Sequence, residues 1–396
     1  MLQALEVDNF KTLNQFRIEF SPLTVVVGNN ASGKSTILQV LDLMCSSVLE
    51  DFGSILMRRG WNIPDLKSKC REKPSSKLQV SAEFILTVEE KVRRLRWELA
   101  LQYMVQKNTM NLYSERVIDQ ENGFVYLEYT DKGVSIAGAH GENIRFPRLS
   151  SDSSVMKVTV DEERGQKEYP ELVILKRYLT GMRSFELLSP DQMRSSSRGK
   201  SMNLSVSGKN FPSFLKSLSD SQKGRFLEKL RQLSGNRIED VTTETKGKPG
   251  WTYVNVTEKY RDIRYTVSSR HLSDGMLRLL AFLGLSESED GTLLLLDEIE
   301  NGVNSSYAES LMRIFYEMSK GGRQLLATTH SVVFLDYVKK EDIVYLYRDE
   351  KTGSTKTAKI FELPELQEKL EYMYPGEIIY NTTNQKLIEL CLSSTQ

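Results

Sequence analysis

The chain has 396 residues, 39% of them hydrophobic, so it can bury a substantial core and modestly exceeds the usual size of one compact domain. Its 53 basic and 53 acidic residues give a formal charge of +0, so no whole-chain field favours nucleic acid as a partner. Three scattered cysteines, no signal-peptide pattern and no apolar run near about twenty residues exclude a disulfide framework and predict a soluble, cytoplasmic protein without a membrane span.

The N-terminal part alternates short apolar runs with turns. Strands are predicted at 2–7, 16–20 and 23–27, and the last of these runs ends at Gly28. A helix is predicted over 34–44 because its apolar residues recur at helical spacing. A strand, a glycine-rich loop and a helix therefore follow one another.

The next part of the chain predicts a β-rich lobe. Serine-rich polar stretches at 150–165 and 195–200 are predicted to be loops. Antiparallel strands are predicted at 78–87, 92–105, 111–117 and 124–129.

The C-terminal half changes to helical spacing. Residues 211–233 predict a helical pair, far too short for a long coiled coil, and strands follow at 251–256 and 263–267. A hairpin around Gly353 and further helices close the chain. Alternating helices and strands, which indicate a parallel sheet, are predicted at 272–285, 292–296, 307–318, 324–328 and 343–347.

These patterns divide the chain into three expected regions. Residues 1–200 form an N-terminal lobe with the glycine-rich loop and the β-rich segment. Residues 201–260 form a helical insertion with strands, and residues 261–396 form a C-terminal lobe with the second helix-and-strand series.

The glycine-rich loop matches the phosphate-loop pattern G-x-x-x-x-G-K-[ST]. Its glycines allow backbone N–H groups to point at phosphate oxygens, and the following helix adds its positive dipole end. Lys34 is expected to reach the β- and γ-phosphates of ATP, and the Ser35 hydroxyl to ligate Mg²⁺. The residues expected to bind ATP here are Gly28, Asn29, Asn30, Ala31, Ser32, Gly33, Lys34, Ser35 and Thr36.

Two acids follow the predicted strand 292–296. Asp297 is expected to hold Mg²⁺ and Glu298 to orient the attacking water, although a buried strand that simply ends in solvated acids is the plainer alternative. His330 ends another buried strand, at the edge where open α/β sheets hold ligands. An imidazole there can donate a hydrogen bond to the γ-phosphate and sense its presence.

A serine and a glycine begin an apolar helix at Leu272-Ser273-Asp274-Gly275-Met276-Leu277-Arg278. In local chemistry Ser273 is an N-cap residue. In context the segment resembles the ABC signature motif, in which one subunit contacts the γ-phosphate held by another. Ser273 and Gly275 match that motif and are expected to contact ATP, whereas Asp274 and Met276 depart from the commonest form, L-S-G-G-Q.

The whole series resembles the chromosome-maintenance, RecF and OLD-like branch of ABC ATPases. It runs DNFKTL, GNNASGKST, LSDGMLR, LLLLDEIENGV and ATTHS, in that order, with Gly208–Phe211 similar to the G-x-N-L element and Glu300–Asn304 to the D-loop. Within that branch it looks like the ATPases without a Toprim domain in bacterial anti-phage defence systems such as Septu, PARIS and retron-linked systems. The fold implied is α/β: a P-loop NTPase of the ABC head type with a β-rich lobe and a helical lobe, and without a long coiled coil.

The resemblance implies an ATPase in which two heads enclose ATP and Mg²⁺, with Lys34, Glu298 and His330 as catalytic residues. The expected assembly is a homodimer or a larger even-numbered oligomer that controls a partner effector, a nuclease or toxin. No nuclease is expected within the chain, because no Toprim-like domain follows His330 and the three histidines, His140, His271 and His330, are too scattered for an H-N-H site.

Two other functions stay open at this level. A RecF-like repair or loading ATPase would bind DNA, and a nucleotide-sensing scaffold would bind ATP with negligible turnover; a transporter ATPase fits least. A DNA groove or a solvated loop is predicted from the basic residues Arg58, Arg59, Lys67, Lys69, Arg71 and Lys73.

Overall fold

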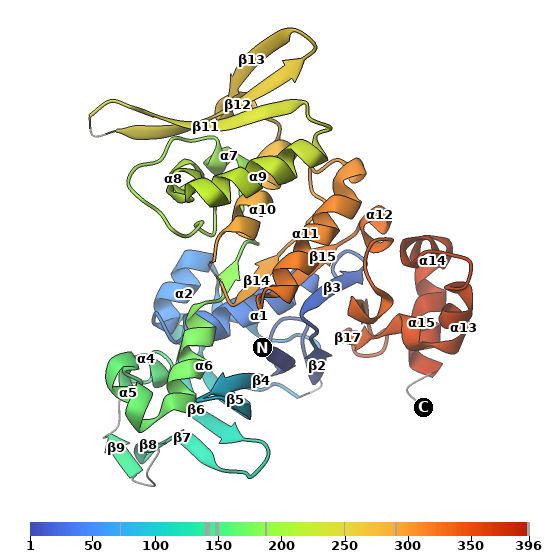
Figure 1. Cartoon of the computed structure of the whole chain (residues 1–396). Helices are drawn as coiled ribbons and strands as arrows, with labels where there is room; N and C mark the ends of the chain where they lie inside the picture. The colour runs from blue at the N-terminus through green and yellow to red at the C-terminus, as the bar shows by residue number, and fades with distance from the viewer. Residues whose placement is uncertain are drawn as a thin grey trace. The chain divides into compact units, whose positions relative to one another are not determined.

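The computed structural model describes residues 1–71, 73–138, 143–146, 150–186, 188–248, 250–289 and 291–393. The chain forms two compact units, neither continuous in sequence (Figure 1). The first comprises Met1–Met182, Glu341–Gln367 and Thr383–Gln396, and the second Arg183–Lys340 and Glu368–Thr382. The boundaries expected at residues 200 and 260 stay a prediction.

An eight-stranded antiparallel sheet dominates the first unit, with the strand order β2-β1-β4-β5-β6-β7-β8-β9. One side-chain face packs inward, as the alternation of buried and half-buried residues along β5 shows. The strands are β1 (Leu2–Asp8), β2 (Phe16–Glu19), β4 (Lys77–Val88), β5 (Lys91–Met104), β6 (Thr109–Asp119), β7 (Val125–Thr130), β8 (Gly133–Ala137) and β9 (Asn143–Phe146).

The first unit also holds three strands of a six-stranded sheet, one of which leads into the phosphate loop. Strand β3 (Leu23–Gly28) is buried at every position and runs parallel to β16 (Ile343–Arg348), which pairs antiparallel with β17 (Thr355–Ala358). The predicted hairpin around Gly353 is therefore confirmed. The helices of this part and of the C-terminus are α1 (Lys34–Ser46), α2 (Phe52–Arg59), α3 (Ile63–Leu66), α4 (Met156–Thr159), α5 (Glu162–Glu168), α6 (Pro170–Thr180), α13 (Pro364–Lys369) and α15 (Asn384–Ser393).

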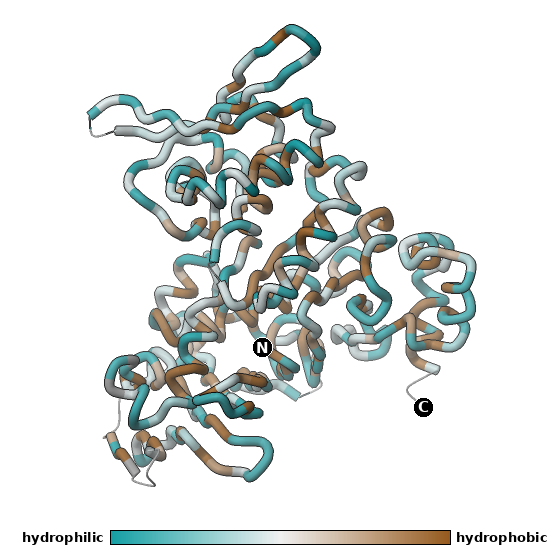
Figure 2. Tube along the Cα trace, in the orientation of Figure 1, coloured by the Kyte–Doolittle hydropathy of each residue, from teal (hydrophilic) through white to brown (hydrophobic). Residues whose placement is uncertain are grey.

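The second unit combines parallel strands with helices. Strands β10 (Arg183–Ser184), β14 (Leu293–Leu296) and β15 (Gln324–Thr329) are parallel neighbours in that order, which confirms the parallel pairing predicted for this part. Figure 2 shows hydrophobic residues gathered on the elements around β14 and β15. The helices are α7 (Pro190–Met193), α8 (Phe211–Ser217), α9 (Asp220–Leu233), α10 (Asp274–Glu287), α11 (Ala308–Lys320), α12 (Val332–Leu335) and α14 (Pro375–Asn381).

A three-stranded antiparallel sheet completes the second unit. It consists of β11 (Ile238–Lys246), β12 (Trp251–Tyr260) and β13 (Ile263–Ser268). The predicted helical pair is confirmed as α8 and α9, and α9 begins with a capping box formed by Ser219 and Gln222. Helices α9 and α10, with 14 residues each, are the longest among the described residues. The described part of the chain is therefore an α/β structure that contains no long coiled coil.

The predicted loop at 150–165 is wrong in part, because α4 and most of α5 fall within it. Val155 and Met156 are almost fully buried, so packing orders a segment whose serine-rich composition favours a loop. The loop at 195–200 is confirmed apart from a single bridge between Ser197 and Thr252.

A buried carboxyl group lies on β6 in the first unit. Glu115 is 0% exposed and accepts hydrogen bonds from Trp97 Nε1 (2.9 Å), Ser154 Oγ (2.7 Å) and the Val155 backbone N–H (2.8 Å). Burial raises the pKa of Glu115 to about 7, against the pull of these donors, which lower it.

Stability is therefore expected to depend on pH through Glu115. Folding raises the pKa of Glu115 from 4.5 in the unfolded chain to about 7. Its contribution to the unfolding free energy is therefore fully present below pH 4.5 and is lost as the pH rises through about 7. Over that window the unfolding free energy should fall by about 3 kcal/mol more in the wild type than in Glu115→Gln, which does not titrate. Urea unfolding at a series of pH values checks this. Equal pH slopes in the two proteins would contradict it.

Candidate functional site

The phosphate loop joins β3 to α1 in the first unit. Gly33 is the N-cap residue of α1 with a φ of 109°, and a Cβ there would lie 2.5 Å from Thr355 Oγ1, so only glycine fits. A Cβ on Gly28 would lie 2.3 Å from the Leu346 carbonyl oxygen. The Lys34 ammonium donates to the carbonyl oxygens of Gly28 (2.8 Å) and Asn29 (3.0 Å). Both glycines of the motif are thus required by the packing around the loop.

Residues from the far end of the sequence hold this loop. Thr355 Oγ1 lies 2.8 Å from the Ser32 carbonyl oxygen and 2.7 Å from Thr12 Oγ1. Arg348 Nη1 donates to the carbonyl oxygen of Ala31 at 3.2 Å. Ala31 has a φ of 62°, a conformation that a non-glycine residue needs such support to keep. The motif pattern alone gives no sign of these supporting residues.

The loop suits a polyphosphate ligand by its chemistry. The Ser32 hydroxyl is buried and has no hydrogen-bond partner among the described residues. It can therefore still donate a hydrogen bond to a polar ligand atom bound inside the loop. Helix α1 has 13 residues and begins at this loop, which aims its positive dipole end there. Lys34 adds a full positive charge, which matches a phosphate oxygen.

The acidic end of β14 lies beside the end of β15 in the second unit. Thr328, fully buried on β15, connects the two: its hydroxyl donates to Asp297 Oδ1 and accepts the backbone N–H of Glu298 at 2.9 Å. The Ile299 N–H donates to the Thr328 carbonyl oxygen at 3.1 Å. Thr328 therefore fixes both acids, and the sequence patterns did not single it out.

Glu298 and His330 both face solvent. Glu298 has a φ of 46°, a left-handed conformation that is strained for a glutamate, and Asn301 Nδ2 lies 3.4 Å from its Oε2. The backbone N–H of His330 donates to Glu300 Oε1 at 2.5 Å. The parallel strands thus bring Asp297, Glu298 and His330 to one edge of the sheet, as predicted for a ligand-binding edge.

A substitution at Thr328 tests whether its hydroxyl positions the acids. Thr328→Val keeps the shape but removes the partner of the Glu298 N–H, so a destabilisation of about 1–3 kcal/mol is expected. The ATP turnover expected from the motifs should fall roughly tenfold because both acids lose their common anchor. Thr328→Ser keeps the hydroxyl and should stay near wild type. Phosphate release and thermal unfolding measure both effects; equal loss in Val and Ser variants would contradict this role.

The signature segment begins α10. Ser273 is the N-cap residue and accepts the Met276 N–H at 3.2 Å, so the local capping role is confirmed. Arg194 pairs with Asp274 and donates to the Leu272 carbonyl oxygen at 3.0 Å. Asp274, the departure from the commonest motif, thus has a specific partner.

Gly275 is held against the segment that resembles the D-loop. A Cβ on Gly275 would lie 1.7 Å from the Gly302 carbonyl oxygen, and Gly302 itself has a φ of 71°. Any larger residue at 275 would push this segment away. Close backbone approach is therefore one physical reason for Gly275, besides the nucleotide contact expected from the resemblance.

Each unit gathers its own set of predicted residues. Gly28–Thr36 lie together in the first unit, and Ser273, Gly275, Asp297, Glu298 and His330 belong to the second. His140 lies outside the described residues.

The three arginines of the basic stretch considered for DNA pair with acids. Arg58 bonds Asp42 and Glu50, Arg59 bonds Asp42, and Arg71 bonds Asp8. Neutralised arginines attract phosphates weakly, which disfavours a DNA groove at these positions.

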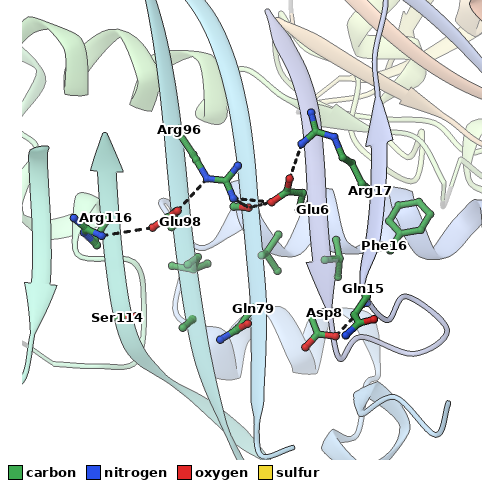
Figure 3. A pocket seen from close by; sticks show the side chains of 15 residues that line it. Glu6, Asp8, Gln15, Phe16, Arg17, Gln79, Arg96, Glu98, Ser114 and Arg116 are labelled. Carbon is green, nitrogen blue, oxygen red and sulfur yellow. Dashed lines mark hydrogen bonds and ion pairs between the residues drawn. The ribbon is translucent and has the colours of Figure 1, made fainter. Parts of the chain in front are cut away.

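A hollow of about 500 Å³ lies on the polar face of the eight-stranded sheet (Figure 3). Arg96 pairs there with Glu6 (2.6 Å) and Glu98 (3.0 Å), and Arg17 pairs with Glu6 (2.5 Å). The hydrogen bond from Arg96 lowers the pKa of Glu6. Because the charges are matched, we assign no nucleotide or phosphate to this hollow.

Residues 23–86 and 117–336 match the family described as "AAA domain, putative AbiEii toxin, Type IV TA system". The chain belongs to this family. The match includes the phosphate loop, the signature segment, the acidic strand end and His330. Membership of the AAA-domain family supports the expected ATP-binding ATPase class.

Two relatives and one solved structure are similar to this AAA-domain chain. An ATP/GTP phosphatase from Helicobacter pylori (strain ATCC 700392 / 26695) is 22% identical over 85% of this chain and 87% of its own. An OLD nuclease from Thermus scotoductus (strain ATCC 700910 / SA-01) is 44% identical over 48 residues, 12% of this chain and 9% of that nuclease. The chain thus matches only a small fraction of the nuclease.

The solved structure is an SmcHead bound to the C-winged helix domain of ScpA. It aligns with a TM-score of 0.53 at 15% identity and covers 90% of this chain and 96% of its own. The AAA-domain chain therefore has the head fold of an SMC-type P-loop ATPase, as the motif order predicted. Among its described residues, no helix has the length and apolar character that crossing a bilayer requires.

Proposed function

We propose that this protein hydrolyses ATP and that the phosphate loop and the acidic strand end supply the residues for this reaction. The observation that carries the proposal is the Thr328 hydroxyl, which holds Asp297 and the Glu298 backbone together beside His330. A buried strand ending in merely solvated acids would not need this anchor. The family match and the similarity to an ATP/GTP phosphatase support the same reaction class.

Each residue has a definite role in this proposal. Lys34 leaves its two carbonyl partners and binds the β- and γ-phosphates, while the α1 N-terminus binds phosphate oxygens. Ser35 and Asp297 hold Mg²⁺, which when bound supplies charge neutralisation on the phosphates. Glu298 accepts a hydrogen bond from the attacking water and orients it. His330 donates to the γ-phosphate and reports its presence.

The site is completed by a second copy of the chain. Ser273 and Gly275 of one protomer contact the γ-phosphate bound by the other, so ATP joins the heads and hydrolysis releases them. The assembly is a homodimer or a larger even-numbered oligomer. The head fold shared with the SmcHead structure supports this arrangement.

ATP binding and hydrolysis by the paired heads control a partner effector in a cytoplasmic anti-phage defence system. The effector in this proposal is a nuclease or toxin. The opening and closing of the heads would present or withhold this partner.

The test measures phosphate release and oligomeric mass on the same wild-type samples, with ATP and Mg²⁺, with ADP, and without nucleotide. Turnover that requires Mg²⁺ and an even-numbered assembly that forms only with ATP are expected. Tight ATP binding without turnover would reduce the protein to a nucleotide-sensing scaffold. An oligomeric mass that is the same with ATP, with ADP and without nucleotide would contradict the head-dimer mechanism.

A further inference from the structure

Exposed tyrosines gather in the second unit near α14. Tyr372, Tyr374 and Tyr380 are 70%, 64% and 77% exposed, and all lie within nine residues of each other. Large aromatic side chains normally bury most of their surface, so such a group marks an interaction site. Tyrosine is also among the residues enriched at the centres of protein interfaces.

The helix that carries Tyr380, α14, packs closely against α12. The Gly376 N–H donates to Asp336 Oδ1 at 2.8 Å, and a Cβ on Gly376 would lie 2.0 Å from the Val332 carbonyl oxygen. Helix α14 therefore seats closely on α12, as Figure 1 also shows. On α12 and directly after it, Val333 and Tyr337 are 38% and 43% exposed. We call Val333, Tyr337, Tyr372, Tyr374 and Tyr380 the tyrosine face.

The tyrosine face carries negative charge. Glu371 and Glu377 are exposed, and neither forms an ion pair with any described residue. Glu377 accepts the Tyr374 backbone N–H at 3.0 Å, and helical spacing puts it beside Tyr380. Burial raises the pKa of Asp336, and the charge of Glu377 adds to the rise, as expected of a locally negative surface.

We propose that the tyrosine face binds an arginine-bearing segment of a different polypeptide. A guanidinium group stacks on tyrosine rings and also donates two hydrogen bonds to a carboxylate, so it fits tyrosines interleaved with glutamates. A second copy of this chain fits poorly, because a two-fold contact would place Glu371 and Glu377 near their own equivalents.

The inference deepens the proposed function and rests on it for the meaning of binding: this polypeptide is the partner effector. Helix α12 begins immediately after His330 and Ser331, so the predicted γ-phosphate sensor and the tyrosine face share one short segment. The binding itself needs no nucleotide, so its test stands apart from the test of ATP hydrolysis.

The experiment uses short fluorescein-labelled peptides in which leucine alternates with arginine, lysine or glutamate, and measures fluorescence anisotropy with the full chain. The arginine peptide should bind most tightly. Its affinity should fall roughly tenfold or more in the triple variant Tyr372→Ala, Tyr374→Ala, Tyr380→Ala. Glu371→Gln with Glu377→Gln should weaken it and flatten its salt dependence, while the new amide oxygen can still accept the Tyr374 N–H and keep the start of α14 intact.

Tyr113→Ala is the matched control, because Tyr113 is 54% exposed on β6 in the first unit. Its variant should bind the arginine peptide like the wild type. Thermal unfolding shows whether each variant is folded. The proposal is overturned if the triple variant binds like the wild type, if all peptides bind equally, or if the triple variant lowers the oligomeric mass, which would make the face a contact between copies.

Discussion

Glu298→Gln should lower the turnover number for ATP roughly 100-fold or more, because an amide orients and polarises the attacking water far less than a carboxylate. ATP affinity should change by no more than about threefold, since the proposed role of Glu298 is to act on the water and not on the bound nucleotide. With hydrolysis blocked, the ATP-bound assembly should accumulate, and its mass should persist after free ATP is removed. Phosphate release and light scattering on the same sample measure both effects.

The backbone at Glu298 makes glutamine a suitable replacement. Its φ of 46° and the N–H bond to Thr328 are independent of the side-chain charge, so the local structure should survive. Glu289→Gln, the same change at an exposed position of the second unit, is the control and should match the wild type. Unchanged turnover in Glu298→Gln would move the water-activating role to another residue.

Sequence patterns predicted most elements that depend on local signals. The buried run of β3, the helical spacing of α1 and the alternation of α10 to β16 each follow from side chains close together in sequence. Helices α4 and α5 were missed because tertiary packing, which buries Val155 and Met156, overrides a loop-like composition.

The candidate site divides in the same way. Lys34, Asp297 and Glu298 lie in motifs whose spacing matches the expected chemistry, so the sequence alone singles them out as candidates. Thr328 lies in the ATTHS motif, where only His330 was given a role, and the role of its hydroxyl appears only when β15 pairs with β14.

Sequence patterns also miss the residues that contact the motifs from distant positions in the chain. Thr355 reaches the phosphate loop, and Gly302 reaches Gly275, through contacts that no local pattern encodes. A motif search therefore finds the groups proposed to bind the ligand and misses those that hold them in place.

Lys34→Met should raise the dissociation constant for ATP roughly 10- to 100-fold, because the variant lacks the charged hydrogen bond from the lysine ammonium to the phosphate oxygens. Methionine nearly preserves the side-chain volume, so the loop should stay packed between Gly28 and Thr355. The fold itself should change little, because the ammonium bonds that the variant loses include those to the backbone carbonyl oxygens of Gly28 and Asn29 and the loop keeps its packing. Turnover and ATP-dependent assembly should disappear together, unlike in Glu298→Gln, where assembly persists.

The control for this substitution is Lys107→Met, which removes an equal charge from an exposed position of the same unit. Titration calorimetry with ATP and Mg²⁺ separates the two variants, because only the phosphate-loop lysine can reach a bound phosphate from the start of α1. Thermal unfolding without nucleotide should give similar midpoints for both variants. If Lys34→Met binds ATP like Lys107→Met, the nucleotide binds elsewhere. The roles proposed for Ser35, Asp297 and Glu298 would then be wrong as well.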